Sequence, residues 1–345
     1  MMAPHLHLFE GEPDWLSHTL VKGNQGTSAI TVTLEDGTSI QRLDTGVLEV
    51  TPVADSGERL IVSAGVHGNE TAPIEVLNTL VSELVRGDWS AGLPMLLILG
   101  HPAAMVNGTR FLEFNLNRLF SGAHAKPPYA GTPEAARAAY LEDICTQFAA
   151  PAKTLFHYDL HTAIRPSHRE KFALYPFVPG RTVPQSQSDF LLEADVPTLL
   201  LQHKSGTTFS SFSSTRLNAE SFTIELGKVQ PFGKNDLSRF KGIEQALRRL
   251  FSGQPAPTLS DAQTADSAVF EVVHEIINTG EHFSFHVPDD VANFTAYPPG
   301  TLIWEDETTQ YHVGEVPESI VFPNRDVPIG QRVGLLVREH FFFFF

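Results

Sequence analysis

The stretch RLIVSAGVHGNETA, residues 59–72, decides the fold of this chain. Its first six residues form a compact, largely apolar run that predicts a buried β-strand, and two glycines then bracket a turn. Residues 70–86 follow with apolar side chains at helical spacing, on a face that consists of Leu77, Leu80, Val81, Leu84 and Val85. Gly87 stands directly after them, where glycine commonly ends a helix. A buried strand that leads through a short turn into a helix is a unit from which α/β folds are built.

The alternation of strands and helices continues to about residue 250. Apolar runs that predict strands lie at residues 95–99, 154–160, 172–178, 197–203 and 221–226. Thr132 and Pro133 are typical N-cap and first-turn residues of a helix. Another helix closes the block before Gly253, with an apolar face of Phe240, Ile243, Leu247 and Leu250. Strands of this apolar character predict an α/β domain whose central sheet is buried on both faces.

The two ends of the chain differ from this pattern. The first fifty residues are predicted to be β, because Ile30, Val32 and Leu34 alternate with polar residues before an Asp-Gly turn. Beyond a segment rich in Pro, Ser, Ala and Thr, short strand-like runs continue without a helical period. We therefore expect an α/β domain at 1–253 that includes a β segment at 1–52, a linker at 254–267, an all-β domain at 268–340 and a tail of five phenylalanines at 341–345.

Composition argues against several classes of function. Forty acidic side chains against 24 basic ones give a formal net charge of −16, and so acidic a surface repels nucleic acid and anionic lipid. Cys145 is the only cysteine, so the chain can form neither an intramolecular disulfide nor a thiolate zinc site. No apolar run is long enough to span a bilayer, and the first residues do not resemble a signal peptide. These features predict a cytoplasmic protein that binds neither nucleic acid nor a membrane.

His67 and Glu70 form an H-x-x-E pair in the turn between the strand and the helix. Across such a turn, an imidazole and a carboxylate can both reach one point beyond the carboxyl end of the strand, where open α/β sheets place their sites. A zinc site with two histidines and one glutamate needs a second imidazole, and His161 fits because it ends another strand-like run. Asp159, two residues earlier, could orient that histidine. The three residues therefore predict a catalytic zinc site, with one ion per chain.

Each of these residues also has an ordinary interpretation. An H-x-x-E pair arises by chance in many proteins of this size. It indicates a metal site only in combination with the strand–turn–helix context and with a second histidine at a strand end. Glu225 follows Phe222 and Ile224, which suggests a strand whose end presents one carboxylate. That carboxylate could act as a general base and then as a general acid, or it could be an ordinary carboxylate at the surface.

A group of cationic and amide side chains surrounds the segments of the predicted metal site. Arg110, Asn117 and Arg118 lie in a loop after an apolar strand, and Arg165 follows the second histidine by four residues. Guanidinium groups bind carboxylates in a bidentate manner, so arginines that cluster in an acidic chain predict a small anionic substrate. The alternative is that these arginines pair with acidic residues nearby.

Five motifs resemble those of the succinylglutamate desuccinylase/aspartoacylase family, which belongs to the zinc carboxypeptidase-like superfamily. They are GVHGNET, NGTR, FNLNR, DLHTAIR and FTIELGKVQPFG, and they occur in the order of the family between about residues 60 and 235. Within the family, the last two motifs are more similar to those of the desuccinylases than to those of the aspartoacylases. The resemblance implies a central mixed sheet flanked by helices, as in the zinc carboxypeptidases, with a smaller C-terminal all-β domain.

The resemblance also implies a function and a set of site residues. The function is the zinc-dependent hydrolysis of the amide bond of N-succinyl-L-glutamate, an anionic N-acyl amino acid, to succinate and L-glutamate in bacterial arginine degradation. The residues are the zinc ligands His67, Glu70 and His161, the catalytic base Glu225, Arg110 near the scissile carbonyl, and the substrate-binding residues Asn117, Arg118 and Arg165.

Other functions remain open on the sequence. An aspartoacylase-like deacylase or a metallocarboxypeptidase would perform the same chemistry, and their anionic substrates would need the same arginines. A zinc-binding interaction module would need the three ligands but no catalytic base.

Overall fold

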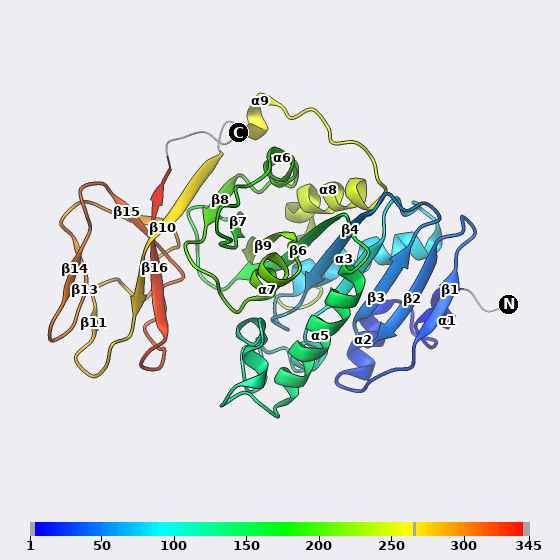
Figure 1. Cartoon of the computed structure of the whole chain (residues 1–345), viewed down its shortest axis with the longest axis horizontal. Helices are drawn as coiled ribbons and strands as arrows, with labels where there is room; N and C mark the ends of the chain where they lie inside the picture. The colour runs from blue at the N-terminus through cyan, green and yellow to red at the C-terminus, as the bar shows by residue number, and fades with distance from the viewer. Residues whose placement is uncertain (1–3, 265–266, 341–345) are drawn as a thin grey trace.

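One large sheet forms the centre of the molecule, and helices cover both of its faces (Figure 1). The computed structural model describes residues 4–264 and 267–340, and in them this sheet has 13 strands in the order β1-β2-β3-β5-β4-β6-β9-β7-β8-β10-β16-β15-β12. Its first nine strands along the chain are β1 (Ile30–Thr33), β2 (Ser39–Asp44), β3 (Val47–Thr51), β4 (Glu58–Ala64), β5 (Met95–Leu99), β6 (Thr154–Ala163), β7 (Phe172–Tyr175), β8 (Thr198–Leu201) and β9 (Glu220–Lys228). The α-helices are α1 (Pro4–Leu8), α2 (Trp15–Lys22), α3 (Thr71–Arg86), α4 (Pro102–Asn107), α5 (Pro133–Ala149), α6 (Gln185–Glu193), α7 (Phe209–Arg216), α8 (Lys241–Phe251) and α9 (Asp261–Thr264).

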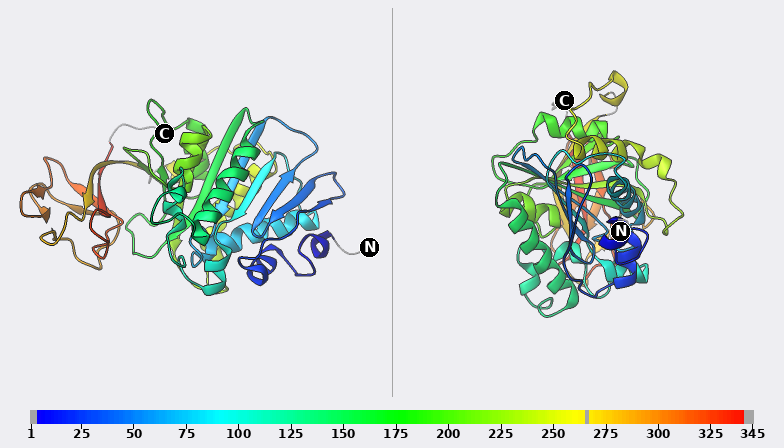
Figure 2. Two further views of the ribbon diagram at one scale, coloured as in Figure 1. Left: turned by 60° about the horizontal axis from the view of Figure 1, so that its bottom comes forward. Right: turned by 90° about the vertical axis from the view of Figure 1, so that its right-hand side faces the viewer.

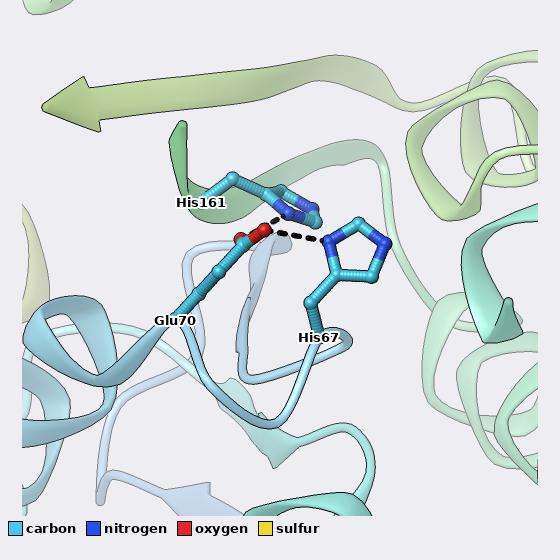
Figure 3. Close-up of side chains that lie close together, drawn as sticks. All are labelled: His67, Glu70 and His161. Atoms are coloured by element: carbon cyan, nitrogen blue, oxygen red, sulfur yellow. Dashed lines mark hydrogen bonds and ion pairs between the residues drawn. The ribbon is translucent and has the colours of Figure 1, made fainter. Parts of the chain in front are cut away.

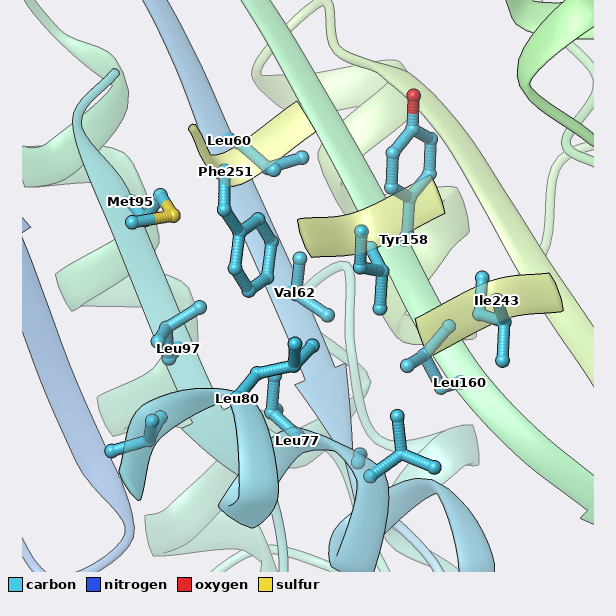
Figure 4. Packing of buried hydrophobic residues seen from close by; sticks show 14 of the residues in the cluster. Leu60, Val62, Leu77, Leu80, Met95, Leu97, Tyr158, Leu160, Ile243 and Phe251 are labelled. Atoms are coloured by element: carbon cyan, nitrogen blue, oxygen red, sulfur yellow. The ribbon is translucent and has the colours of Figure 1, made fainter. Parts of the chain in front are cut away.

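Strand β4 is buried on both faces, and its side chains alternate between two helical layers. Leu60 and Val62 pack with residues of α3 and α8 in one hydrophobic core (Figure 4). Ile61, between them, packs with residues of α5 and α7 in a second core. Because successive side chains of a strand point to opposite faces, one uninterrupted apolar run contributes to both cores at once.

Four central strands run parallel and bring their carboxyl ends to one edge of the sheet. Strand β4 pairs in parallel with β5 and with β6, and β6 pairs in parallel with β9. The flanking strands β3 and β7 run antiparallel to their neighbours β5 and β9, so the sheet is mixed. The segments that follow the four parallel strands therefore meet at one edge of the sheet, where open α/β sheets bind ligands.

The N-terminal segment differs from the prediction. Strands β1, β2 and β3 are present, but helices α1 and α2 precede them, so the prediction of a β segment over residues 1–52 is wrong at its beginning. Asp14 caps α2, because its side chain accepts a hydrogen bond of 2.7 Å from the backbone N of Ser17. The helix buries Trp15 and His18, which lie three residues apart and therefore on one face. So short an amphipathic face is a weak signal in the sequence.

The C-terminal strands form a smaller all-β domain that stays joined to the central sheet. They are β10 (Ala268–Ile277), β11 (Ser284–Phe285), β12 (Thr295–Tyr297), β13 (Leu302–Glu305), β14 (Gln310–His312), β15 (Glu318–Val321) and β16 (Arg332–Glu339). Residues 268–271 of β10 pair in parallel with β8, and β10 continues antiparallel to β16. Strands β11, β13 and β14 form a second sheet. Figures 1 and 2 show these strands at one end of the molecule and the N-terminal helices at the other. The predicted fold class is thus confirmed.

Two predicted segments lie partly or wholly outside the described residues. Residues 254–260 of the predicted linker lack regular structure and are largely exposed, and α9 follows them, whereas residues 265–266 and the phenylalanine tail at 341–345 are not described. Among the described helices, none is both long enough and apolar enough to cross a membrane.

Candidate active site

Three potential metal ligands converge at the carboxyl ends of β4 and β6 (Figure 3). His67 and Glu70 lie in the turn between β4 and α3, and His161 lies near the end of β6. One ligand atom from each residue lies within 4.8 Å of the other two, and all three residues are buried. The structure therefore brings together the three residues that the sequence predicts as a metal site, and a metal ion could bind there.

Two glycines shape the turn that carries the first two of these residues. Gly65 has a φ of +64°, in the left-handed region that favours glycine. A Cβ atom at Gly68 would collide with the backbone of Ala104 and Met105, so glycine allows the turn to lie directly against α4. The backbone N of Gly68 donates a hydrogen bond of 3.1 Å to the carbonyl oxygen of Arg110, which fixes the turn to the next loop of the site.

The hydrogen bonds of the two histidines orient their Nδ1 atoms toward Glu70. Nε2 of His161 lies 2.8 Å from Oδ2 of Asp159, and Nε2 of His67 lies 3.0 Å from Oδ1 of Asn115. With a proton on Nε2, each ring would leave its Nδ1 lone pair available to a metal ion. Nδ1 of each ring faces one carboxylate oxygen of Glu70 at 2.8 Å. This set of two imidazole nitrogens and one carboxylate fits a divalent cation, and an acceptor behind each histidine is typical of metal sites.

Burial and neighbouring charges shift the pKa values of all three residues. Burial lowers the pKa of His67 to about 4, so its imidazole is neutral at pH 7. Burial also acts to lower the pKa of His161, but the carboxylates of Asp159 and Glu70 outweigh it and hold this pKa well above its ordinary value. Burial would raise the pKa of Glu70, yet the charges and hydrogen bonds of the two histidines bring it well below the usual range. Glu70 is therefore an ionised carboxylate, as a metal ligand must be.

Glu225 lies on the strand next to His161, and its carboxyl group is buried. The two residues are partners in the register of β6 and β9. Glu225 is 8% exposed, and its Oε2 has no hydrogen-bond partner among the residues that the structure describes. Burial raises the pKa of Glu225 to about 7, although the nearby charges of His161 and Arg110 act to lower it. A carboxyl group of this kind can take up and release a proton near neutral pH, which is what general acid–base catalysis needs.

Arg110 reaches the same site from the loop after α4. Its Nη1 donates a hydrogen bond of 2.6 Å to Oε1 of Glu70. One third of its side chain is exposed, so the guanidinium group lies between the ligands and solvent. In this position Arg110 can contact a substrate that approaches the three ligands.

Asn117 and Arg118 belong to the 3₁₀-helix η1 (Leu116–Arg118) beside the ligands. Asn117 is buried, its Oδ1 accepts a hydrogen bond of 2.9 Å from the backbone N of Phe209, and its Nδ2 lies 3.5 Å from Nε2 of His161. Arg118 is exposed and donates to the carbonyl oxygen of Asn117 at 2.8 Å. No carboxylate of the described residues lies within ion-pairing distance of Arg118, so its charge is available to an anion.

Arg165 has its contact in the C-terminal domain. Its Nη1 donates a short hydrogen bond to the carbonyl oxygen of Asp289, in the segment between β11 and β12. The structure thus places Arg165 at the junction of the catalytic and C-terminal domains, and brings Arg110, rather than Arg165, into contact with a ligand residue.

Two residues that support the ligands were not predicted from the sequence. Asn115 orients His67, and its position two residues before Asn117 in the FNLNR motif is the only local signal. Ser63 donates to Oδ1 of Asp159 at 2.6 Å, from the neighbouring strand β4. A serine within an apolar strand carries no sign of this role, because its partner lies 96 residues away in the sequence.

Two family models and several curated proteins match the sequence of this chain. Residues 56–285 match the sequence model of the succinylglutamate desuccinylase/aspartoacylase catalytic domain, and residues 265–340 match that of the AstE/AspA barrel-sandwich hybrid domain. A succinylglutamate desuccinylase of Shewanella putrefaciens is 42% identical over 323 residues, which are 92% of this chain and 93% of that protein.

Solved structures of similar proteins share the whole architecture. The succinylglutamate desuccinylase of Vibrio parahaemolyticus superimposes with a TM-score of 0.87 at 33% identity, over 95% of each chain. That of Chromobacterium violaceum gives a TM-score of 0.84 at 36% identity, over 95% of this chain and 98% of the other. The similarity covers the catalytic and the C-terminal domain alike. The chain is therefore an enzyme, and it belongs to the succinylglutamate desuccinylase/aspartoacylase family of hydrolases.

Proposed function

We propose that this enzyme is a zinc-dependent amidohydrolase that cleaves N-succinyl-L-glutamate to succinate and L-glutamate. The observation that carries the proposal is the convergence of two imidazole nitrogens and one carboxylate within 4.8 Å, with the buried carboxyl group of Glu225 on the adjacent strand. The choice of substrate is supported by relatives that are 42% identical and bear the name succinylglutamate desuccinylase.

In this proposal His67, Glu70 and His161 hold one zinc ion per chain. Two imidazoles and one carboxylate form the protein part of many catalytic zinc sites, which keep a further position for water or substrate. Zinc bound there would polarise the amide carbonyl and would lower the pKa of water at the site towards ~7.

Glu225 moves the protons of the reaction. Its carboxylate takes a proton from the attacking water, whose oxygen forms a bond to the carbonyl carbon of the succinyl amide. The same group gives a proton to the amide nitrogen as the carbon–nitrogen bond breaks, so L-glutamate leaves with a free amino group and succinate leaves as a carboxylate. A pKa of about 7 suits both roles, because a group that acts first as a base and then as an acid works best when its pKa is near the operating pH.

The arginines bind and polarise the substrate. Arg110 donates hydrogen bonds toward the carbonyl oxygen, on which negative charge develops during the attack. Asn117 and Arg118 bind a carboxylate of the substrate, which is consistent with an Arg118 side chain that has no acidic partner among the described residues. Arg165, at the junction with the C-terminal domain, contributes positive charge at the entrance.

A metal assay combined with a panel of substrates tests the proposal. We expect about one zinc ion per chain by mass spectrometry and the fastest release of amino acid from N-succinyl-L-glutamate. Faster hydrolysis of N-acetyl-L-aspartate would indicate an aspartoacylase-like deacylase, and hydrolysis of a peptide would indicate a metallocarboxypeptidase. Bound zinc without turnover of any of the three would leave a zinc-binding module.

We also propose that the reaction takes place in the cytoplasm, as the last step of bacterial arginine degradation. The resemblance of the motifs to those of the family supports this placement. A strain that lacks the gene should grow poorly with arginine as its nitrogen source and should accumulate N-succinyl-L-glutamate. Normal growth without accumulation would refute the placement in this route.

A further inference from the structure

We propose that His157 is a positioning residue for the ligand His161, with which it shares a face of β6. It acts through Ser63 and Asp159, in a buried network of directed hydrogen bonds that begins beneath α7 and ends at the metal site. The inference rests on the proposed function, from which it takes the role of His161 as a zinc ligand.

Polar side chains line the face of β6 and β9 that carries the ligand. At residues 157–161 and 221–225 every second side chain is polar, so these polar side chains share one face of the sheet. The register pairs His157 with Ser221, Asp159 with Thr223 and His161 with Glu225. Tyr158 and Leu160, between the polar residues of β6, belong to an apolar core on the other face. Buried polar groups cost free energy unless they form hydrogen bonds, so the polar face needs partners.

Helix α7 covers this face with serine hydroxyl groups. Oγ of Ser213 lies 2.7 Å from Nδ1 of His157 and 2.8 Å from Oγ of Ser221. The ring of Phe209, at the start of the helix, packs edge-on against the imidazole with 4.6 Å between the ring centres. His157, Ser213 and Ser221 are completely buried, so their partners are protein groups rather than bulk solvent.

The other nitrogen of the His157 ring leads to the metal site. Nε2 of His157 lies 2.9 Å from Oγ of Ser63, on the neighbouring strand β4. The same hydroxyl group donates to Oδ1 of Asp159 at 2.6 Å, and Oδ2 of Asp159 lies 2.8 Å from Nε2 of His161. Ser63 and Asp159 are also completely buried. The contacts are therefore continuous from α7 to the ligand.

The donor and acceptor capacity of these groups fixes the direction of the network. A carboxylate only accepts hydrogen bonds, so the single hydroxyl proton of Ser63 goes to Asp159. The oxygen of Ser63 must then accept from Nε2 of His157, which carries a proton. Burial lowers the pKa of His157 to about 4, so at pH 7 the ring is neutral and its Nδ1 is an acceptor. Ser213 donates to this nitrogen, which is the nearest of its hydrogen-bond partners.

The tautomer of His157 decides which group receives the proton of Ser63. With a proton on Nε2, the ring donates to Ser63 and leaves the hydroxyl proton to Asp159. With an unprotonated Nε2, the ring would compete with Asp159 for this proton, and the carboxylate would lose the contact that holds it toward His161. The hydroxyl group of Ser213 favours the first tautomer, because a donor at Nδ1 requires that nitrogen to be unprotonated. His157 thereby positions the ligand.

The first test compares two amides at position 157 by the zinc affinity of the full-length protein, measured in competition with a chromogenic chelator. Gln places its amide near the position of Nε2 and can donate to Ser63, whereas Asn places its amide near Nδ1 and does not reach Ser63. His157→Asn should weaken zinc binding roughly 2- to 10-fold, the contribution of one neutral hydrogen bond. His157→Gln should restore this bond and bind zinc as the wild type does. Equal affinities of the two variants would overturn the inference.

Two serines of α7 separate the network from a general effect of a lost hydroxyl group. Ser213→Ala removes the donor to Nδ1 and should weaken zinc binding in the same direction as His157→Asn. Ser214→Ala removes the neighbouring buried hydroxyl group, which has no hydrogen-bond partner among the residues that the structure describes. This control should leave the Kd for zinc unchanged, and equal losses in both serine variants would overturn the inference.

A double-mutant cycle tests whether His157 acts through Ser63. Ser63→Ala combined with His157→Asn should lose no more zinc affinity than Ser63→Ala alone, because both substitutions interrupt the same path. Additive losses would show that His157 acts by another route and would overturn the inference.

NMR of isotopically labelled wild-type protein reads the tautomer directly. The protonated and the unprotonated nitrogen of a neutral imidazole have distinct chemical shifts, and the signals of His157 are those missing from the spectrum of His157→Gln. At pH 7 the proton should be on Nε2. A proton on Nδ1 would reverse the direction of the network and overturn the inference.

Zinc binding and turnover together separate this inference from the proposed function. A Kd for zinc that depends on His157, with no hydrolysis of N-succinyl-L-glutamate by the wild type, would refute the proposed function and keep the inference. Normal zinc binding and hydrolysis, with a Kd that His157→Asn does not change, would refute the inference alone. If the wild type binds no zinc, both fail.

Discussion

Asp159 and His161 lie on the same face of β6, where Oδ2 of Asp159 accepts a hydrogen bond of 2.8 Å from Nε2 of His161. The strand itself sets this relationship, because side chains two residues apart share a face. The other oxygen of Asp159 accepts a hydrogen bond from Ser63 at 2.6 Å, so the carboxylate is held at both ends. As a result, Nδ1 of His161 is directed at Glu70 rather than at the interior of the sheet.

Asp159→Asn should weaken zinc binding roughly 10- to 100-fold, because the amide keeps the size of the side chain but not the charge that fixes the histidine. Competition with a chromogenic chelator would measure the change in Kd for zinc. Asp143→Asn, at an exposed position of α5, is the matched control and should bind zinc like the wild type. Equal affinities for both variants would show that Asp159 does not orient the ligand.

His67→Ala and His161→Ala should each lose most of the bound zinc, because one histidine and one carboxylate do not hold the ion tightly. Elemental analysis of the purified variants would give the zinc content per chain. His282→Ala removes a histidine that is 66% exposed in the C-terminal domain and should retain the full content. Full occupancy in both ligand variants would contradict the assignment.

Glu225→Gln should lower kcat by roughly two to four orders of magnitude, the usual contribution of a positioned acid–base group. KM and zinc content should change little, since the amide keeps the shape of the side chain and Glu225 is not among the three ligands. Steady-state kinetics together with zinc analysis distinguishes the possible roles. Zinc loss would identify Glu225 as a ligand, and near-normal turnover would reduce it to an ordinary carboxylate at a strand end.

The pH dependence of turnover should carry the signature of Glu225. Its carboxyl group has a raised pKa of about 7, so the basic form that accepts a proton dominates above this pH and is lost below it. The rate should therefore fall as the pH decreases through about 7, or through a lower value once a bound cation stabilises the carboxylate. In a pH–rate profile of Glu225→Gln this acidic limb should be absent. An unchanged limb would assign it to another group.

Arg118→Ala and Arg110→Ala should change different kinetic constants. A contact with a substrate carboxylate is made equally in the ground state and the transition state, so Arg118→Ala should mainly raise KM. Charge on the carbonyl oxygen develops only during the attack, so Arg110→Ala should mainly lower kcat. Initial rates over a range of substrate concentrations would measure both constants. The reverse pattern would exchange the two roles.

His18 should make the folded protein less stable in acid. The residue is completely buried, and Nη1 of Arg42 donates to its Nε2 at 2.9 Å. Burial first, and then the charge of Arg42, lower the pKa of His18 to about 4. Between pH 6.5 and 4 the unfolded chain therefore takes up a proton that the folded state does not bind, and up to about 3 kcal/mol of folding free energy is lost through this window.

Urea unfolding at a series of pH values would measure this loss. His18→Gln keeps an oxygen that can accept from Arg42 but does not titrate, so its stability should fall less between pH 6.5 and 4 than that of the wild type. Above pH 7 the pH dependence of the two proteins should be the same. Parallel curves over the whole range would show that His18 does not titrate as expected.

The central strands and the convergence of the ligands could be predicted from the sequence because their signals are local. A strand buried on both faces is an uninterrupted apolar run, and Gly87, in the left-handed conformation, ends α3 where the helical pattern ends. Thr132 caps α5 by accepting a hydrogen bond of 3.2 Å from the backbone N of Ala135. The H-x-x-E pair needs only the turn between β4 and α3 to bring its two side chains together.

Helix α7 could not be predicted in this way, because what stabilises it is distant in the sequence. Its sequence, FSSFSSTR, contains four serines, whose side chains compete for backbone hydrogen bonds and disfavour helix. In the structure two of these hydroxyl groups find partners on β6 and β9, since Ser213 contacts Nδ1 of His157 at 2.7 Å and Ser210 contacts Thr223 at 2.7 Å.

The ladder between β8 and β10 restricts how the two domains can move. Enzymes that close by a hinge usually swing their domains about a flexible connection, and residues 254–260, exposed and irregular, would offer one. Four parallel residue pairs join β8 directly to β10. A hinge motion of the C-terminal domain would therefore have to break backbone hydrogen bonds of the central sheet. We therefore expect substrate to enter and products to leave by rearrangement of loops at the rim, while the two domains keep a constant orientation.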